Sequence, residues 1–447
     1  MKATTGGRSA WSLPEGRLES RFADKSPPYD GGAARAEAER CLYCHDAPCI
    51  GACPTLIDIP AFIRKIATGN LRGSARTILE ANLLGASCAR VCPVEVLCEG
   101  ACVYTAWGRS PIAIGRLQRF AMESAASPEL LERAAATGRS VGLIGGGPAS
   151  LACAGTLALR GHRTVIYDKG RLPGGLNSTG VAPYKMDLGS ALEEVAFIES
   201  LGVEICAGVE VGRDVTAEEL LAGHDAIFLG PGLGEDSRLG VPGEEGSGVV
   251  GAVEWIRALK TEPGMSLEGV RRAAVIGGGN TAVDVARELA QLGVGDVRII
   301  YRRTEEAMRA YRHEREQARR EGVIFITEAL VKEFMRESGE LRGVELVAAR
   351  GGRPTDEPRG SVAADLVLLA IGQARLGDLV SLFVGVEMND RGHIVADPAT
   401  GATGNARVYA GGDARNGGKE VVNAVAEGQL AARAIDAMLR EKGSSSA

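Results

Sequence analysis

Eight of the ten cysteines of this 447-residue chain lie between Cys41 and Cys102, in two groups of four. The first group, in CLYCHDAPCIGACP at residues 41–54, has the spacing C-x2-C-x4-C-x3-C and ends in a Cys-Pro pair. The second, in CARVCPVEVLCEGAC at residues 88–102, has the spacing C-x3-C-P-x4-C-x3-C. Thiols at this density bind zinc, form disulfides or hold iron–sulfur clusters.

These three possibilities need different surroundings. The N-terminal residues lack the apolar stretch of a signal peptide, so we expect a cytoplasmic protein, in which thiols stay reduced. Zinc sites combine well-separated C-x2-C pairs or include histidine, and only His45 lies nearby. Two four-cysteine runs, each with a Cys-Pro pair, are typical of two-cluster ferredoxins, where the cysteine before proline ligates the other cluster. The pattern therefore favours two iron–sulfur clusters over zinc.

Two segments further along the chain share a second pattern. RSVGLIGGGPAS, from residue 139, and RRAAVIGGGNTA, from residue 271, each combine a short apolar strand, a glycine loop and the start of a helix. A second strand follows each of them, TVIYD at 164–168 and RIIYRR at 298–303. Two such units predict two Rossmann-type nucleotide domains.

The two glycine loops differ at the position that meets the ribose. In the first loop, Gly145 allows a tight turn and Gly147 allows the backbone to approach a pyrophosphate. Asp168 ends the next strand, where a carboxylate accepts bonds from ribose hydroxyls. After the second, Arg302 and Arg303 stand in place of the acid, with Arg309 close behind. Guanidinium groups bind a 2′-phosphate. The first loop thus indicates FAD and the second NADP(H).

The elements that must position these groups follow from the apolar spacing. Ile59, Phe62, Ile63 and Ile66 predict a helix between the cysteine groups, and PIAIGRLQRFAMESA a second one after them. Near the C-terminus, RVYAGGD and the following residues indicate a strand, a Gly-Gly-Asp turn and a long helix.

We therefore predict an α/β protein with an N-terminal α-helical iron–sulfur domain followed by two Rossmann-like domains, the NAD(P)H domain being inserted into the FAD domain. The expected boundaries are 1–136 for the α-helical domain, 137–236 and 375–447 for the two parts of the FAD domain, and 237–374 for the NAD(P)H domain.

Composition excludes several classes of function. The chain is 45% hydrophobic and 24% charged, as in ordinary globular proteins, and its 61 glycines suit a fold that brings backbone close to ligands. A formal net charge of −6 gives no indication of nucleic acid or an anionic membrane as partner. No apolar run approaches the ~18 residues of a membrane span.

Several motifs together closely resemble a known family: CLYCHDAPCIGACPTLIDIPAFI, GASCARVCPVEVLCEGAC, IAIGRLQRFA, GGGPAS and YAGGD. They are similar to the flavin-containing electron-input half of dihydropyrimidine dehydrogenase, which in bacteria is a separate NAD(P)H-oxidising subunit of the PreT type. The resemblance covers nearly the whole chain and extends, more distantly, to the small subunit of glutamate synthase.

The resemblance implies two [4Fe–4S] clusters, one of them with a glutamine ligand. It assigns Cys41, Cys44, Cys49 and Cys102 to cluster 1, and Cys53, Cys92, Cys98 and Gln118 to cluster 2. Spacing alone would instead use all eight cysteines, so Cys88 and Gln118 compete for one position. The resemblance favours Gln118 and leaves Cys88 as a free buried thiol.

The resemblance also implies the nucleotide contacts. For FAD they are Gly145, Gly147, Pro148, Ala149, Asp168, Lys169, Gly174, Gly175, Leu176, Val211, Gly412, Asp413, Glu420 and Val421. For NADP(H) they are Gly278, Gly279, Asn280, Thr281, Arg302, Arg303 and Arg309. Lys185, in GVAPYKM, matches an arginine near the flavin in the family and is the candidate catalytic residue.

The implied activity is oxidation of NADPH, or of NADH, with FAD and two [4Fe–4S] clusters as cofactors. None of the predicted domains is a barrel that could hold FMN and a pyrimidine. The resemblance therefore implies a partner subunit with FMN and ferredoxin-type clusters that reduces uracil or thymine. One alternative is the small subunit of NADPH-dependent glutamate synthase or a related NADPH–ferredoxin module. Another is a zinc-containing nucleotide sensor without turnover.

Overall fold

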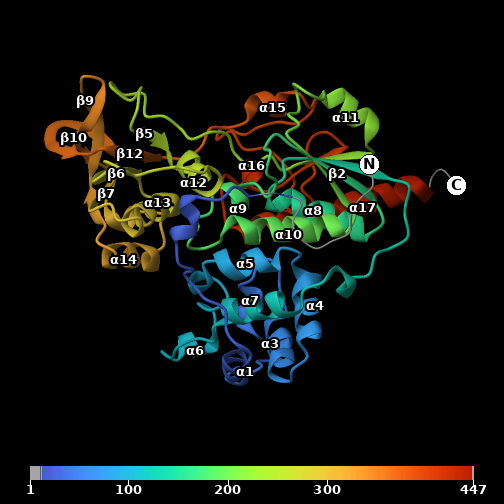
Figure 1. The fold of residues 1–447 in the computed structure, drawn as a ribbon. Helices are drawn as coiled ribbons and strands as arrows, with labels where there is room; N and C mark the ends of the chain where they lie inside the picture. The colour runs from blue at the N-terminus through green and yellow to red at the C-terminus, as the bar shows by residue number, and fades with distance from the viewer. Residues whose placement is uncertain (1–10, 12, 445–447) are drawn as a thin grey trace.

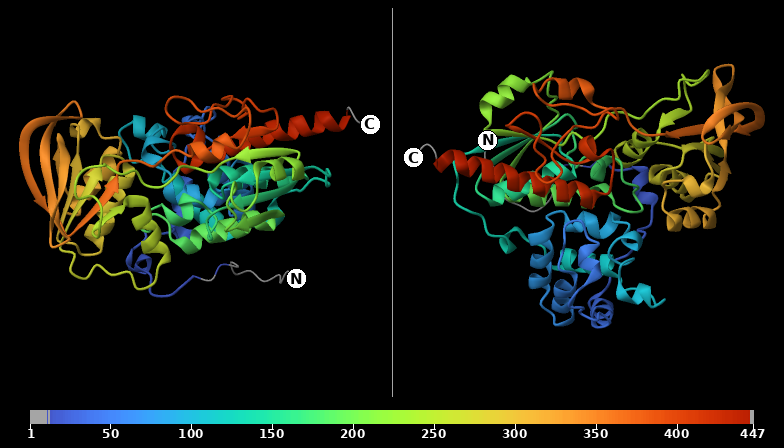
Figure 2. Two further views of the ribbon diagram at one scale, coloured as in Figure 1. Left: turned by 90° about the horizontal axis from the view of Figure 1, so that it is seen from above. Right: turned by 180° about the vertical axis from the view of Figure 1, so that it is seen from behind.

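A computed structural model describes residues 11 and 13–444 of the chain. Two parallel sheets with their helices lie side by side, and a body made only of helices packs below them (Figure 1). The same arrangement is seen from above and from behind (Figure 2). The fold class is therefore the predicted one, an α/β protein preceded by a helical domain. In the described part of the chain, no helix is both long and apolar enough to cross a bilayer.

The helical body is built around one apolar cluster. Its elements are α1 (Gly31–Glu39), α2 (Pro48–Gly51), α3 (Ile59–Ala67), α4 (Leu71–Ala81), α5 (Gly85–Val91), α6 (Val103–Ala106) and α7 (Ile114–Ala125), with short 3₁₀ turns at Val94–Val96 and Pro128–Leu130. A further 3₁₀ turn, Leu18–Arg21, precedes them, and Leu18 packs instead against the apolar cluster that contains Trp255. Asp58 caps α3 by accepting a bond from the Ala61 amide, and Ile59, Phe62, Ile63 and Ile66 are all buried. The helices predicted between and after the cysteine groups are confirmed.

The first parallel sheet has the strand order β13-β4-β1-β2-β3. Its elements are β1 (Ser140–Ile144), α8 (Pro148–Leu159), β2 (Arg163–Asp168), α9 (Leu176–Thr179), α10 (Leu188–Ser200), β3 (Val203–Ala207), α11 (Ala217–Gly223) and β4 (Ala226–Leu229), joined from the C-terminal end by α15 (Gly377–Ser381), β13 (Val408–Ala410), α16 (Asp413–Asn416) and α17 (Val421–Ser444). Because β13 pairs with β4, the C-terminal segment completes a sheet that the first glycine loop begins.

The second parallel sheet lies between these two parts in the sequence and has the order β5-β12-β6-β7-β8. Its elements are β5 (Val249–Gly251), α12 (Ala252–Thr261), β6 (Arg272–Gly277), α13 (Asn280–Gln291), β7 (Asp296–Tyr301), a 3₁₀ turn (Glu305–Ala307), α14 (Arg312–Arg320), β8 (Ile324–Thr327) and β12 (Leu366–Ala370). A three-stranded antiparallel sheet that sequence reasoning missed, β9 (Ala329–Glu337), β10 (Glu340–Arg350) and β11 (Arg353–Ala363), extends its outer side (Figure 1).

The chain crosses between the two parallel sheets twice, and the two crossings lie against each other. The amide of Gly234 donates to the Ala374 carbonyl at 2.9 Å, and the amide of Ser237 donates to the Gly372 carbonyl at 2.9 Å. An isolated antiparallel bridge joins Asp236 to Gln373. The two segments that connect the halves are thus joined to each other by backbone hydrogen bonds.

A second connection is an ion-pair network centred on Glu314, in α14. Its carboxylate lies 2.8 Å from Lys25 Nζ, 3.2 Å from Lys185 Nζ and 2.6 Å from Arg287 Nη1. These cations come from the N-terminal segment, the loop before α10 and α13. Lys185 also pairs with Asp284 at 2.7 Å. One carboxylate therefore ties together three parts of the molecule.

The electrostatic balance at Glu314 shows that its charge is stabilised there. Burial alone opposes ionisation, but the charges of Lys185, Lys25 and Arg287 outweigh it and lower the pKa of Glu314 to about 2. Since this pKa lies below the ordinary value of 4.5, the group stabilises the fold above about pH 4.5. That contribution is lost as the pH falls through about 2.

We predict that Glu314→Gln destabilises the protein. The amide keeps the shape but leaves Lys25, Lys185 and Arg287 with less negative charge, and removing one partner of a buried ion pair costs about 3 kcal/mol. Thermal unfolding of the purified holoprotein measures the effect.

The matched control is Glu316→Gln, on the same helix, where Glu316 pairs with Arg312 at the exposed surface. Loss of this exposed ion pair should leave the unfolding temperature unchanged. Equal unfolding temperatures for Glu314→Gln and Glu316→Gln would contradict a stabilising role of the network.

Candidate functional site

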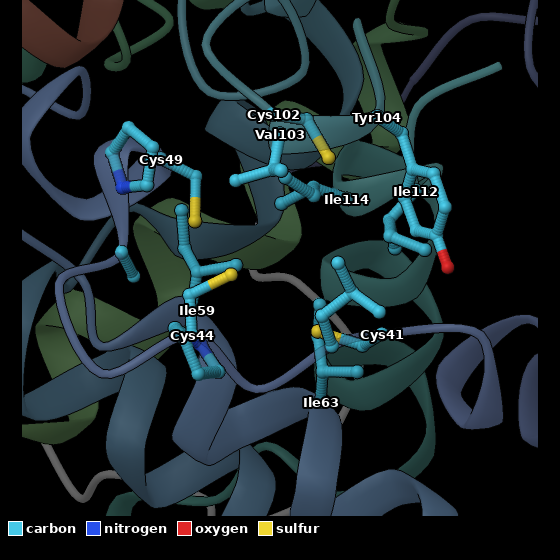
Figure 3. Close-up of a pocket in the computed structure, with 14 residues that line it drawn as sticks. Cys41, Cys44, Cys49, Ile59, Ile63, Cys102, Val103, Tyr104, Ile112 and Ile114 are labelled. Carbon is cyan, nitrogen blue, oxygen red and sulfur yellow. The ribbon is translucent and has the colours of Figure 1, made fainter. Parts of the chain in front are cut away.

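Four thiols of the helical body surround one pocket. They are Cys41, Cys44, Cys49 and Cys102, and Figure 3 shows their sulfur atoms directed toward a common space. Apolar side chains, among them Ile59, Ile63 and Ile112, form the rest of the lining. The structure thus brings together the four residues that the resemblance assigned to cluster 1.

The chemistry of this donor set fits a cationic metal centre. Burial, followed by the charges of the Cys41 and Cys102 thiolates, raises the pKa of Cys49 to about 11. Burial likewise raises the pKa of Cys41. Within residues 11 and 13–444, no three His, Cys, Asp or Glu side chains meet closely enough to hold one metal ion. The thiols are therefore spaced for a group larger than a single ion. Four thiolates here need a positively charged group among them, as an iron–sulfur cluster provides.

A second pocket gathers the other cysteines of the region. It is lined by Cys53, Cys88, Cys92, Cys98 and Gln118. Both candidates for the last ligand position therefore face the same space. The Cys88 sulfur accepts a bond from Asn82 Nδ2 at 3.3 Å, and Gln118 Nε2 donates to the Gly85 carbonyl at 2.8 Å.

Helix α5, which carries Cys88, is held by the neighbouring domain. Glu194, in α10, accepts bonds from the amides of Ala86 and Ser87, both at 3.0 Å, and from the Ser87 hydroxyl. Burial raises the pKa of Glu194 to about 7, although these bonds oppose the shift. Sequence reasoning missed this contact because the glutamate lies 107 residues from Ser87.

The first glycine loop is tightly packed at Gly145 and Gly146. A Cβ on Gly146 would lie 2.3 Å from an oxygen of Asp168, and one on Gly175 would lie 2.7 Å from the Gly147 Cα. The amide of Gly174 donates to the Gly146 carbonyl at 2.8 Å, so the loops after β1 and β2 pack against each other. They form a cradle at the carboxyl ends of the strands, where dinucleotides bind in this type of sheet.

The C-terminal segment reaches the same end of the sheet. Gly412 has φ +71° and lies so near α8 that its Cβ would be 2.9 Å from the Ala149 Cβ. Asp413 accepts a bond from the Lys419 amide at 3.2 Å, and Glu420 and Val421 stand at the start of α17. These residues suit the ribityl and ring end of a flavin, because a helix N-terminus favours negative charge.

The second glycine loop opens onto a cavity of about 530 Å³. Its lining includes Gly278, Gly279, Thr281, Arg302, Arg303 and Arg309. The three arginines are exposed, and Tyr301 packs so closely on the loop that a Cβ on Gly278 would lie 2.4 Å from its ring. This basic groove beside a glycine loop has the donor groups that a phosphorylated dinucleotide needs.

Asn280 lies at the same loop but bonds within the protein, since its Oδ1 accepts from the Tyr311 amide at 3.0 Å. The Tyr311 hydroxyl in turn donates to Glu420 at 2.6 Å. Burial, followed by this bond, raises the pKa of Tyr311 above the ordinary range. Sequence reasoning missed Tyr311, which joins the second glycine loop to the start of α17.

The remaining predicted residues differ in their surroundings. Lys185, whose side chain is 13% exposed, pairs with Asp284 and Glu314, within the network described above. Val211 is buried and forms an isolated bridge with Val215. Lys169, after β2, is exposed, and Leu176 begins α9. Pro148 and Ala149 begin α8, as a loop-to-helix turn requires.

Two family models match the chain. Residues 18–130 match the 4Fe-4S cluster domain II of dihydropyrimidine dehydrogenase, and residues 139–428 match the pyridine nucleotide-disulphide oxidoreductases. The first match covers both cysteine groups and the second both glycine loops. The predicted cofactor classes, FAD, NAD(P)H and 4Fe-4S, are thereby confirmed, and the zinc alternative is set aside.

Curated relatives align along nearly the full length. The small chain of NADPH-dependent glutamate synthase from Halomonas elongata is 35% identical over 93% of this chain and 93% of its own. The NAD-dependent dihydropyrimidine dehydrogenase subunit PreT from Escherichia coli O157:H7 is 36% identical over 92% of this chain and 95% of its own. The predicted resemblance to both is confirmed, at nearly equal identity.

Among solved structures, thioredoxin reductase of T. acidophilum aligns with a TM-score of 0.53 and 22% identity, over 67% of this chain and 99% of its own. That likeness shows the two-sheet fold. Together with the family matches, it leads to one conclusion. The chain belongs to the pyridine nucleotide-disulphide oxidoreductase family, as an FAD- and NAD(P)-dependent oxidoreductase that carries a 4Fe-4S domain.

Proposed function

We propose that the protein takes hydride from NADPH, or from NADH, and delivers the electrons, by way of FAD and two [4Fe–4S] clusters, to an FMN-containing partner subunit. That partner reduces uracil or thymine to the 5,6-dihydropyrimidine. In this division of work the cofactors supply the electron chemistry, whereas the protein fixes their positions.

The observation that carries the proposal is the neighbourhood of the second cysteine pocket. Val422, in the first turn of α17, lines this pocket together with Cys53 and Cys92. The two preceding residues, Glu420 and Val421, are the ones assigned to the flavin. A flavin at the start of α17 and a cluster in the second pocket would therefore be neighbours, as electron transfer between them requires.

The ligands we propose are Cys41, Cys44, Cys49 and Cys102 for cluster 1 and Cys53, Cys92, Cys98 and Gln118 for cluster 2. For Gln118, the hydrogen bond from its amide nitrogen to Gly85 fixes the side chain. Its amide oxygen is then the atom available to a metal. The Cys88 sulfur instead accepts a bond from Asn82 Nδ2.

The protein's own residues position the nucleotides. Around FAD we place the glycines and Asp168 of the first sheet together with Gly412, Asp413, Glu420 and Val421. For the nicotinamide cofactor we place Gly278–Thr281 at the pyrophosphate and Arg302, Arg303 and Arg309 at the 2′-phosphate. Catalysis then rests on orientation, because stacked rings at near-attack distance need no nucleophile. The boundaries 1–136, 137–236, 237–374 and 375–447 stay part of this proposal.

A second candidate is the donor subunit of a glutamate synthase, since the identity to that small chain is 35% and to PreT 36%. Its donor half would be the same, and only the acceptor would differ. To decide between the two, the chain is purified anaerobically with its native partner, and NADPH oxidation is followed after adding uracil or, separately, glutamine with 2-oxoglutarate.

Under the pyrimidine proposal, only uracil accelerates NADPH oxidation by the complex. Acceleration by glutamine with 2-oxoglutarate would instead establish the second candidate. Isolated protein without flavin and acid-labile sulfide would contradict both.

The arginines of the second groove should select the phosphorylated nucleotide. A charge-assisted hydrogen bond contributes about 1.5–3 kcal/mol, so we expect Arg302→Ala and Arg303→Ala each to lower kcat/KM for NADPH about 10-fold or more. The value for NADH should not change. Arg312→Ala, outside the groove and paired with Glu316, is the control. Equal losses with NADPH and NADH would refute a 2′-phosphate contact.

The choice between Cys88 and Gln118 is tested by substituting each. Gln118→Ala should change the EPR spectrum of one reduced cluster and lower the iron content, because it removes a ligand. Cys88→Ser should preserve iron, labile sulfide and both EPR signals. The reverse pattern would assign the position to Cys88.

A further inference from the structure

Three helices of the molecule begin close to one side chain, that of Tyr311. Tyr311 directly precedes α14, and its backbone amide donates at 3.0 Å to Oδ1 of Asn280, the residue that begins α13. Its hydroxyl donates to Glu420 Oε1 at 2.6 Å. The Glu420 carbonyl accepts the amides of Asn423 and Ala424, at 2.9 and 3.2 Å, so α17 begins directly after it. One tyrosine thus connects the starts of α13, α14 and α17.

Tyr311 extends from one proposed nucleotide site to the other. Its backbone lies at the second glycine loop, where the Ala310 amide also donates to the Gly278 carbonyl at 3.1 Å. Its hydroxyl lies at the start of α17, which we assign to the flavin. A nicotinamide whose pyrophosphate rests on the second glycine loop has to reach the same place to meet the flavin ring. The Tyr311 side chain therefore joins the two positions whose separation decides hydride transfer.

A neighbouring ring supports Tyr311 from the side. His313 stacks on Tyr311, with the ring centroids 5.7 Å apart and an angle of 6° between the ring planes. His313 Nε2 lies 3.4 Å from the carboxylate of Glu95, which belongs to the 3₁₀ turn between Cys92 and Cys98. Through His313, the helical body therefore contributes to the orientation of the Tyr311 ring.

The bond from Tyr311 to Glu420 is suited to hold these parts together. Both side chains are half-buried. Burial, followed by this bond, raises the pKa of Tyr311, so the phenol keeps its proton at neutral pH and donates to the carboxylate. Hydrogen bonds to a carboxylate are shorter and roughly twice as strong as those between neutral groups.

The backbone that carries Tyr311 is fixed by other contacts. Glu314, in the first turn of α14, pairs with Lys25, Lys185 and Arg287 in the network described above. That network joins the same parts of the molecule without Tyr311. Loss of the Tyr311 hydroxyl should therefore change the local separation of the two nucleotide sites rather than the fold.

We propose that Tyr311 is a positioning residue for hydride transfer, because its bond to Glu420 sets the separation between the second glycine loop and the start of α17. The inference rests on the proposed function, in which the C4–H bond of the reduced nicotinamide breaks and its hydrogen passes with both electrons to the flavin. The nicotinamide is oxidised and the flavin reduced, and Tyr311 exchanges no atom with either. Displacing reacting groups by about 1 Å can lower a rate about 100-fold. Loss of the bond should therefore slow the transfer without weakening nucleotide binding.

The test uses purified holoprotein, mixed rapidly and anaerobically with NADPH or NADH, whichever bleaches the flavin absorbance faster. Tyr311→Phe, which removes only the hydroxyl, should lower the rate of flavin reduction at saturating nucleotide about 10-fold. The dissociation constant of the matching oxidised nucleotide should not change. The long-wavelength absorbance band of stacked nicotinamide and flavin rings should weaken. Without nicotinamide, amide hydrogen exchange should become faster in residues 278–283 and 420–426.

Tyr29→Phe is the matched control, because this tyrosine lies in the helical body, where the Arg116 guanidinium is 3.7 Å from its ring centroid. It should leave the rate, the dissociation constant and the absorbance band unchanged. Glu420→Ala should also slow flavin reduction. Adding Tyr311→Phe to Glu420→Ala should cause no further loss, since both substitutions act through one bond.

Undiminished flavin reduction by Tyr311→Phe would overturn the inference. Slower reduction with an equally weakened nucleotide affinity would assign Tyr311 to nucleotide binding and overturn it as well. Failure of the unaltered protein to reduce its flavin with either nucleotide would instead overturn the proposed function, and the positioning role with it. Because the experiment needs no partner subunit, its result does not depend on which acceptor the protein serves.

Discussion

The first turn of α17 is shared by three parts of the molecule. Val422 lines the second cysteine pocket, and Glu420 accepts a bond from Tyr311 of the second nucleotide domain. Gly412, in the segment that precedes α17, lies against Ala149 in the first turn of α8. Redox groups exchange electrons only when they are close, so a relay needs its parts held at fixed separations. The position of this one helix end constrains every other part of the proposed relay.

Polar contacts join the two nucleotide domains. Lys260, fully buried in α12, donates to the carbonyls of Asn177, Val181 and Met186 across the boundary between the sheets. Burial lowers the pKa of Lys260 to about 8, so the ammonium is kept at an energetic cost. Lys260 and the cations around Glu314 find their hydrogen-bond and ion-pair partners in this relative orientation of the two sheets, and a shift of one sheet would leave buried charges without partners. An apolar interface of equal area would tolerate sliding.

Local patterns were predictable from the sequence, and long-range pairings were not. Ile59 and Phe62 mark a helix because their spacing follows its period, and the glycine loops mark strand-to-helix turns because only glycine fits there. The contact between Lys185 and Glu314 joins residues that no local pattern connects, and neither side chain signals its partner. The strands after Ala329 were missed because β11 is mostly exposed and contains Pro354 and Pro358, which weaken a strand pattern.

The two cysteine pockets would give their clusters different environments. Burial raises the pKa of Cys98 and, more moderately, that of Cys41, so a cluster in the second pocket is in the less hydrated environment. Hydration and net charge are two determinants of cluster potential. Cys53 and Cys88 of the second pocket are buried, whereas all four cysteines of the first are half-buried, so the two sites have different electronic surroundings. The more buried pocket is lined by Val422 of α17, and the other pocket is lined by the exposed Leu42 and by Tyr104. The environment of each proposed cluster therefore differs with its distance from α17.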